Sequence, residues 1–219
     1  MYTLYIGNKN YSSWSLRAWV LMKAFGVPFR EERIALYEPD SPARIRGRSP
    51  SAKLPCLHDD TTIVWDSLAI AEYLAERHPG MWPNAAAARA WARSAAAEMH
   101  SGYANLRNEF GMNLRVHEKR QGSPAVEADI ARIATLWREG RERHGRGGDF
   151  LCGAFGIVDA FYCPVAFRFE SYGVALDATC AQYHRTLLAL PATREWAEGA
   201  ARETEHIPAL DRPAAAGQR

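Results

Sequence analysis

Residues 2–36 read YTLYIGNKNYSSWSLRAWVLMKAFGVPFREERIAL, and this stretch decides the fold. Residues 2–6 alternate as a strand does, and a loop rich in Gly and Asn follows them. From about Ser13 apolar side chains recur at helical spacing, and Gly26 ends that helix. Residues 29–36 then predict a second strand. Two strands joined by a helix pair in parallel through a right-handed crossover, so the stretch predicts a βαβ unit.

The next forty residues predict a hairpin followed by a helix. Residues 55–58 and 61–65 read as short strands, and two aspartates at 59–60 form a turn between them. Oxygen-bearing side chains at 66–67 can cap a helix whose apolar face ends near residue 78. The predicted order of elements is therefore β-α-β, a short helix, then β-β-α.

Strand signals end beyond residue 80, where Ala, Arg, Glu and Leu dominate the sequence to about residue 205. Breaks near residues 122–124, 146–148, 173 and 191 divide this region into five predicted helices, and short connections predict an antiparallel bundle. We expect one domain over residues 1–80, an all-helical domain over 85–207, and a flexible tail over 208–219.

Composition excludes several classes of protein. The chain has 219 residues, with 27 Lys and Arg against 25 Asp and Glu, so it lacks the one-sided basic charge of a nucleic-acid-binding protein. No apolar run approaches the ~20 residues that span a bilayer, which predicts no membrane association and a cytoplasmic location. Four dispersed cysteines indicate reduced thiols rather than disulfides or a zinc site, and we expect no metal.

The start of the first helix is the first candidate for chemistry. Unpaired N–H groups and the helix dipole stabilise an anion there. Residues 11–15 contain no cysteine, which excludes thiol–disulfide exchange at this position. The hydroxyls of Ser12 and Ser13 could donate a hydrogen bond to a thiolate supplied by another molecule. The alternative is that one of them only caps the helix.

Two further segments fit the same groove. Pro55 opens a short strand after Lys53 and Leu54, and a cis peptide there would present the backbone of Leu54 to a peptide ligand; a trans turn proline is the alternative. Asp66 and Ser67 could bind an amine and a carboxylate at a helix start, or only cap it.

Taken together, these segments resemble those of the cytosolic glutathione transferases over essentially the whole chain. The resemblance rests on residues 12–17, 53–57 and 66–74, and on 150–160, which is similar to a buried helix-capping segment of that family. Residues 12–17 are most similar to the zeta class, whose signature is Ser-Ser-Cys-Ser followed by arginine. The resemblance implies an α/β thioredoxin-like amino-terminal domain, an all-α helical bundle and a homodimer.

The resemblance also implies a role for each matched residue, with glutathione as co-substrate. Either Ser12 or Ser13 would hydrogen-bond the glutathione sulfur, and both remain open. Leu54 would pair its backbone with the cysteinyl part of glutathione before a cis Pro55. Asp66 and Ser67 would hold the γ-glutamyl amine and carboxylate, and Lys53 would approach the glycyl carboxylate.

Among the departures from the family's pattern, those at Trp14, Gly156 and Arg168 matter most here. Trp14 replaces the zeta cysteine, which argues against transferring isomerase activity directly. Gly156 replaces a Ser or Thr cap three residues before Asp159, a loss that costs only a few tenths of a kcal/mol. Arg168 lies one helical turn before a functional arginine of the zeta class; it could still face the pocket, but we expect it to form a salt bridge.

The second substrate is expected between the domains, against the first long helix of the bundle. We place that region, without assigning roles, at Met99, Tyr103, Phe110, Met112, Asn113 and Arg115. Apolar residues at this spacing are more often core than pocket.

Two functions are in competition. The first is a transferase that activates the glutathione thiol for conjugation to a small electrophile, or for isomerisation by reversible addition. The second is a non-catalytic module of the same shape that binds or dimerises. A glutathione-dependent reductase is disfavoured because neither Ser12 nor Ser13 can form the mixed disulfide.

Overall fold

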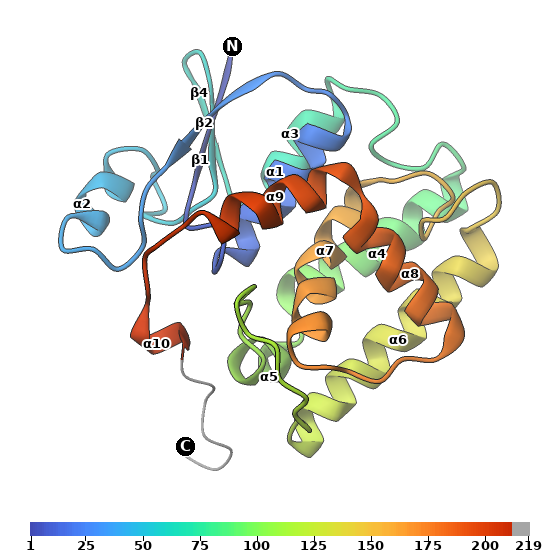
Figure 1. Cartoon of the computed structure of the whole chain (residues 1–219). Coiled ribbons are helices and arrows are strands. Elements are labelled where there is room, and N and C mark those ends of the chain that lie inside the picture. The colour runs from blue at the N-terminus through green and yellow to red at the C-terminus, as the bar shows by residue number, and fades with distance from the viewer. Residues whose placement is uncertain (212–219) are drawn as a thin grey trace.

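The computed structural model describes residues 1–211, and its first part has the predicted element order (Figure 1). The elements are β1 (Tyr2–Ile6), α1 (Ser13–Ala24), β2 (Phe29–Arg33), α2 (Ser41–Arg46), β3 (Cys56–Asp59), β4 (Thr62–Trp65) and α3 (Ser67–Ala75). The second strand is shorter than predicted because the N–H of Leu36 bonds the side chain of Asn8, 2.7 Å away, rather than β1.

The four strands form one mixed sheet in the order β2-β1-β3-β4. Strands β1 and β2 are parallel, with Tyr2 opposite Phe29, which confirms the predicted βαβ unit. Strand β3 is antiparallel to both β1 and β4, so the predicted hairpin is also confirmed.

Helices cover both faces of this sheet. Helices α1 and α3 pack on the face toward the helical part of the chain, and α2 lies on the other face (Figure 1). On the α2 side, Tyr5, Ile34, Ile45 and Cys56 form a small separate core. The sheet is therefore the centre of a thioredoxin-like layer, as predicted.

Residues 86–201 contain six helices rather than the five predicted. They are α4 (Ala86–Ser101), α5 (Ala104–Glu109), α6 (Pro124–His144), α7 (Ile157–Ser171), α8 (Ala178–Ala189) and α9 (Pro191–Ala201). The first predicted helix is divided because Tyr103 adopts a left-handed conformation, with φ of 58°, between α4 and α5. Residues 110–123 form no helix.

Helix α7 lies at the centre of the helical part and contacts α1, α4 and α8. Its amino end is capped by Asp159, whose carboxylate accepts the N–H of Gly156 at 2.9 Å and of Leu151 at 3.0 Å. A side chain at Gly156 would place its Cβ 2.8 Å from the carbonyl oxygen of Met81. Glycine is therefore required by this packing, and the cap survives through Asp159.

The end of the described chain differs from the predicted tail. Residues 208–211 form a short helix, α10 (Pro208–Asp211), and Tyr11 donates to Asp211 at 2.6 Å. The rest of the predicted tail, residues 212–219, lies outside the described residues. The boundaries of the two domains stay a prediction.

Two findings concern the state of the cysteines and the possibility of membrane-spanning helices. All four cysteines are free thiols, and three of them are buried. Across residues 1–211, the helices are all too short or too polar to cross a bilayer.

Candidate functional site

The candidate site begins at the amino end of α1. Ser12 is the N-cap residue, but its side chain makes no capping hydrogen bond. Its hydroxyl donates instead to Ser15 Oγ at 2.7 Å, and Ser15 Oγ also accepts the N–H of Gly7 at 3.1 Å. A side chain at Gly7 would meet Ser12 Cβ at 3.1 Å, so the loop packs tightly here. The hydroxyl proton of Ser12 is thus engaged within the protein.

Ser13 has a different environment. Its Oγ accepts a hydrogen bond from Nη2 of Arg168, 3.2 Å away on α7. A guanidinium has donors only, so this bond leaves the hydroxyl proton of Ser13 free to donate. Arg168 makes no salt bridge within residues 1–211, and the prediction that it would form one is wrong; its other bonds go to the carbonyl oxygens of Phe110 and Pro164.

Three arginines gather around Ser13 and Trp14. The guanidinium of Arg17 lies 4.3 Å from the centre of the Trp14 ring, and that of Arg107 lies 4.8 Å from it. Burial, and then repulsion from Arg107 and Arg168, lowers the pKa of Arg17 well below its usual value. Burial, and then Arg107, lowers the pKa of Arg168 to about 10, so it stays charged at neutral pH.

Within residues 1–211, these three guanidinium groups hydrogen-bond only to neutral oxygen atoms. Arg17 is 2% exposed, and its Nε has no partner in the described part of the chain. Buried cations without a paired carboxylate are costly, and such an arrangement favours an anionic ligand.

The segment before β3 contains the predicted backbone feature. The peptide bond between Leu54 and Pro55 is cis. Leu54 is half-buried and packs against the small core on the α2 side, and Lys53 is exposed. Lys53 forms no ion pair among the residues that the structure describes.

The amino end of α3 holds Asp66 and Ser67. Asp66 has a φ of 74°, and its carboxylate accepts the N–H of Leu68 at 2.8 Å, so the predicted cap is present. Its other oxygen lies 3.3 Å from Nε2 of His100 on α4. Burial lowers the pKa of His100 despite the attraction of Asp66, so this is a contact between a carboxylate and a mainly neutral imidazole at pH 7.

Arg17 connects the two helix ends. Its Nη1 donates to Oγ of the buried Ser67 at 3.5 Å, while its guanidinium packs on Trp14. Arg17 of α1 therefore links its own helix to the predicted Ser67 of α3, whereas within residues 1–211 Lys53 and Leu54 are not joined to these residues by a hydrogen bond.

The carboxyl-terminal segment holds the loop that carries the serines. The carboxylate of Glu203 accepts the N–H groups of Lys9 at 2.7 Å and of Asn10 at 3.0 Å. Arg115 in turn donates to the carbonyl oxygens of Glu203 and Glu205. The loop before α1 is thus fixed by residues almost two hundred positions away.

Sequence reasoning gave no role to Arg17, His100 and Arg107, which surround Trp14. It singled out Arg168 but did not predict its contact with Ser13. The residues expected along one long helix are divided: Met99 lies on α4, and Asn113 and Arg115 lie in the irregular segment after α5. Met99 and Phe110 are buried, in agreement with the interpretation of that set as core.

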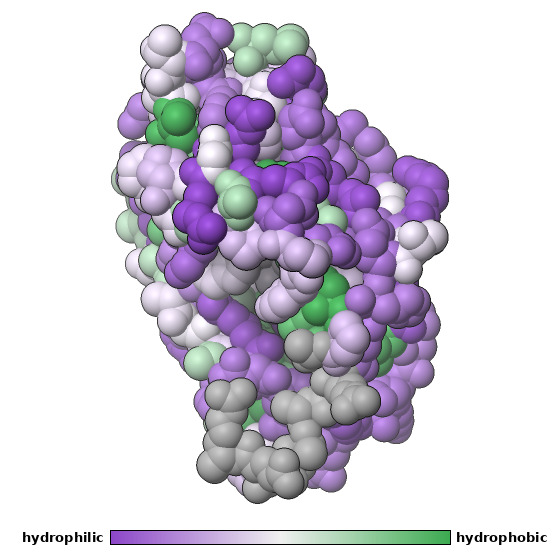
Figure 2. Space-filling view, turned by 90° about the vertical axis from the view of Figure 1, so that its left-hand side faces the viewer, coloured by the Kyte–Doolittle hydropathy of each residue, from purple (hydrophilic) through white to green (hydrophobic). Residues whose placement is uncertain are grey.

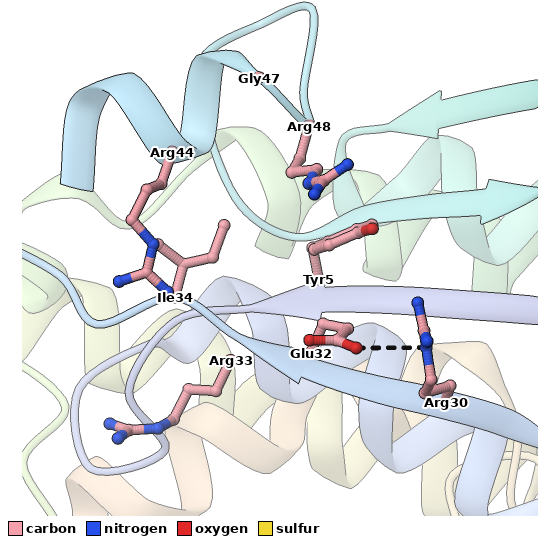
Figure 3. A pocket seen from close by; sticks show the side chains of 8 residues that line it. All are labelled: Tyr5, Arg30, Glu32, Arg33, Ile34, Arg44, Gly47 and Arg48. Carbon is pink, nitrogen blue, oxygen red and sulfur yellow. Dashed lines mark ion pairs between the residues drawn. The ribbon is translucent and has the colours of Figure 1, made fainter. Parts of the chain in front are cut away.

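Two surface cavities lie away from these residues. One, of about 470 Å³, lies beside α2 and is lined in part by Arg30, Glu32, Arg44 and Arg48; Figure 3 shows the ion pair between Arg30 and Glu32, at 3.2 Å. The other, of about 600 Å³, is lined mainly by α7, α9 and the segment after α5. Neither is lined by a residue predicted to bind glutathione, but the second is lined by Arg115, which lies in the region expected to hold the second substrate. Figure 2 shows the face that carries α2, where hydrophilic residues dominate.

Comparisons with known proteins agree with one another. Residues 11–77 match the family described as "Glutathione S-transferase, N-terminal domain". A Caenorhabditis elegans protein named "Probable maleylacetoacetate isomerase" is 30% identical over 190 residues, which cover 82% of this chain and 85% of that protein.

Solved structures with the same fold include two that hold glutathione. A glutathione transferase homologue from Burkholderia is 20% identical with a TM-score of 0.70, and the match covers 92% of this chain and 99% of that one. A theta class glutathione S-transferase from Xanthomonas axonopodis pv. citri is 21% identical with a TM-score of 0.67, over 90% and 96% of the two chains.

Proposed function

Because the chain belongs to the glutathione S-transferase family, a family of enzymes, we propose that it binds glutathione and activates the thiol as a thiolate for reaction with a small electrophile. One observation carries the assignment of the activating group. Ser13 Oγ accepts from Arg168, and its proton has no acceptor within residues 1–211, whereas the Ser12 hydroxyl donates to Ser15. We therefore assign to Ser13 the hydrogen bond to the glutathione sulfur.

The proposed binding mode uses the other predicted residues. The backbone of Leu54 before cis Pro55 would pair with the cysteinyl part of glutathione, as an added strand does. Asp66 and Ser67 would hold the γ-glutamyl amine and carboxylate, and the nearby charge of Arg17 favours that carboxylate. Lys53, exposed and without an ion pair in the described chain, is free to reach the glycyl carboxylate.

The chemical step follows from the thiolate. A hydroxyl that donates to the charged form of a thiol lowers the thiol pKa, so more thiolate exists at neutral pH. In conjugation the sulfur lone pair forms a bond to an electrophilic carbon, and either a leaving group departs from that carbon with its bonding pair, or the π pair of a double bond moves to the neighbouring atom and takes a proton from water. In isomerisation the sulfur adds to one carbon of a conjugated double bond, the resulting single bond rotates, and the carbon–sulfur bond breaks to release the isomer and the thiolate.

Isomerisation is the more specific proposal of the two. It is supported by the name of the C. elegans relative, and by the positive charge of Arg17, Arg107 and Arg168. None of the three forms an ion pair within residues 1–211, although Asp66 attracts Arg17 and Asp129 attracts Arg107, and this charge favours an anionic substrate. Trp14 stands where the zeta class has cysteine, so both conjugation and isomerisation are to be assayed.

The test is the ultraviolet absorbance of the thiolate of bound glutathione. We expect a thiolate band in the wild-type complex at neutral pH, a band that is strongly reduced in Ser13→Ala, and a nearly unchanged band in Ser12→Ala. A band that depends on Ser12 instead would overturn the assignment of Ser13. Glutathione binding without turnover of any electrophile would favour the non-catalytic binding module.

We also propose a homodimer in the cytoplasm. Strand β4 is an edge of the sheet, and it exposes Ile63 and Trp65, which are 40% and 45% accessible. Large apolar side chains on an exposed edge favour a protein contact. Sedimentation is expected to give a dimer for the wild type and a monomer for Trp65→Glu; a 24.5 kDa wild-type species would contradict the proposal.

A further inference from the structure

Arg168 is a charged side chain buried in the interior of α7. It is 4% exposed, and three different nitrogen atoms of its guanidinium donate hydrogen bonds. Nε donates to the carbonyl of Phe110 at 2.9 Å, Nη1 to that of Pro164 at 3.3 Å, and Nη2 to Ser13 Oγ at 3.2 Å. Two backbone carbonyl groups therefore fix the orientation of the guanidinium, and its third hydrogen bond goes to the serine.

The charges that act on Arg168 do not explain its burial. Arg107 on α5 repels it, and Tyr172 is the one group that would attract it if ionised. No carboxylate within residues 1–211 lies within salt-bridge distance of its guanidinium. A buried cation without a carboxylate partner is costly, which is expected where the charge serves a ligand or a catalytic group.

The contact with Ser13 sets the direction of one proton. Since the guanidinium cannot accept a hydrogen bond, Ser13 Oγ must be the acceptor, and its O–H must point elsewhere. A hydroxyl that accepts from a cation also becomes a better donor, because successive hydrogen bonds polarise one another.

We propose that Arg168 is a positioning residue, which holds Ser13 so that its hydroxyl proton is directed at the sulfur of glutathione. The inference rests on the proposed function of Ser13. It assigns to α7, in the helical part of the chain, a role in activating a thiol that would bind at the amino end of α1.

The test is a double-mutant cycle on the pKa of the bound glutathione thiol. The pKa is obtained by titrating the thiolate absorbance of glutathione complexes of the wild type, Ser13→Ala, Arg168→Met and the double variant. We expect Arg168→Met to raise this pKa by about one. At a pH below the wild-type pKa, that rise corresponds to a roughly tenfold loss of thiolate. In the Ser13→Ala background, the same change is expected to alter the thiolate fraction less than about twofold.

Three results would overturn the inference. A wild-type pKa in Arg168→Met means that the arginine does not act on the thiol. An equal shift with and without Ser13 means that its charge acts directly. A wild-type complex without a thiolate band removes the proposed function itself, which is a distinguishable failure. Arg138→Met, which removes an exposed arginine paired with Asp177 at 2.6 Å, is the matched control and is expected to keep the wild-type pKa.

A second variant covers the case in which Arg168→Met does not fold. Arg168→Lys keeps the charge, but one ammonium nitrogen cannot replace three fixed donors. We expect a thiol pKa between those of the wild type and Ser13→Ala. A value equal to the wild type would show that charge alone is sufficient and would overturn the positioning role.

Discussion

Helices α1 and α7 pack against each other, yet their amino ends obtain their hydrogen-bond acceptors from different sources. At α7, the carboxylate of Asp159 accepts from Leu151, Gly156 and the hydroxyl of Tyr183, at 2.8 to 3.0 Å. At α1, the N-cap side chain of Ser12 makes no capping hydrogen bond, and the proton of Ser13 has no acceptor in the described chain.

The difference separates a structural helix end from a functional one. At α7 the protein supplies its own anion, so nothing is left for a ligand to satisfy. At α1 the protein supplies donors and a nearby guanidinium, and an anion from outside would complete the arrangement. Substitutions at α7 should therefore act on stability, and those at α1 on glutathione chemistry.

The largest expected effect is that of Asp159→Ala. The change leaves two backbone N–H groups and one hydroxyl without their acceptor in the core, so we expect the free energy of unfolding to fall by about 4 kcal/mol. Chemical denaturation measures this. Asp177→Ala is the matched control, because Asp177 caps α8 at a more exposed site; we expect about 1 kcal/mol there. Equal losses would contradict the distinction between buried and exposed caps.

The same carboxyl group predicts a pH dependence. Burial raises the pKa of Asp159 to about 6, from 3.8. A raised pKa in the folded state means that its contribution to stability is full below about pH 4 and is lost as the pH rises through about 6. A tenfold change in an ionisation constant corresponds to about 1.4 kcal/mol, so this loss is about 3 kcal/mol.

Unfolding curves of the wild type and Asp159→Asn between pH 4 and pH 7 isolate this contribution. As the pH rises, the unfolding free energy of the wild type should fall relative to that of Asp159→Asn. A difference that is constant over this range would show that Asp159 is not the titrating group.

A smaller effect is expected at the other helix end from Glu203→Gln. The two N–H groups of Lys9 and Asn10 donate to different oxygens of Glu203, and the amide keeps only one acceptor, so one bond is lost and the other loses its charge; we expect about 1 kcal/mol of lost stability. Because this loop leads into Ser12 and Ser13, glutathione affinity should fall several-fold. Glu198→Gln on the exposed side of α9 is the control, and equal affinities of the two variants would count against a role of the loop.

The smallest effect is expected from Ser12→Ala. Its hydroxyl bonds only Ser15 among the described residues, and Ser15 keeps its bond to Gly7. We expect less than about a threefold change in turnover with a small electrophile and less than about 1 kcal/mol in stability. A larger loss of turnover than in Ser13→Ala would reverse the roles given to the two serines.

The sequence predicted the sheet and its helices better than it predicted the long helical region. Strand alternation and the breaks at Gly26 and the aspartates before Thr62 are local signals, and the corresponding elements were predicted to within a few residues. The first bundle helix is divided at Gly102, the C-cap of α4, and at Tyr103 in a left-handed conformation. Gly102 is a local stop signal that sequence reasoning did not use.

In the site too, features set by neighbouring residues were predictable, and contacts between residues far apart in the sequence were not. Asp66 as a cap follows from a short motif, and cis Pro55 was one of two alternatives that the motif allowed and the one that the resemblance implied; both are present. Arg168 stands in an aromatic helix segment, and only folding brings it to Ser13, 155 positions earlier in the chain. The choice between Ser12 and Ser13 depends on that contact, so no local pattern could have made it.

The bonds from Lys9 and Asn10 to Glu203 also have a consequence for biosynthesis. The segment with the serines leaves the ribosome long before Glu203, so the bonds that fix its loop cannot form until the residues around Glu203 have been translated and released. A chain that terminates before Glu203 carries the serines without these contacts.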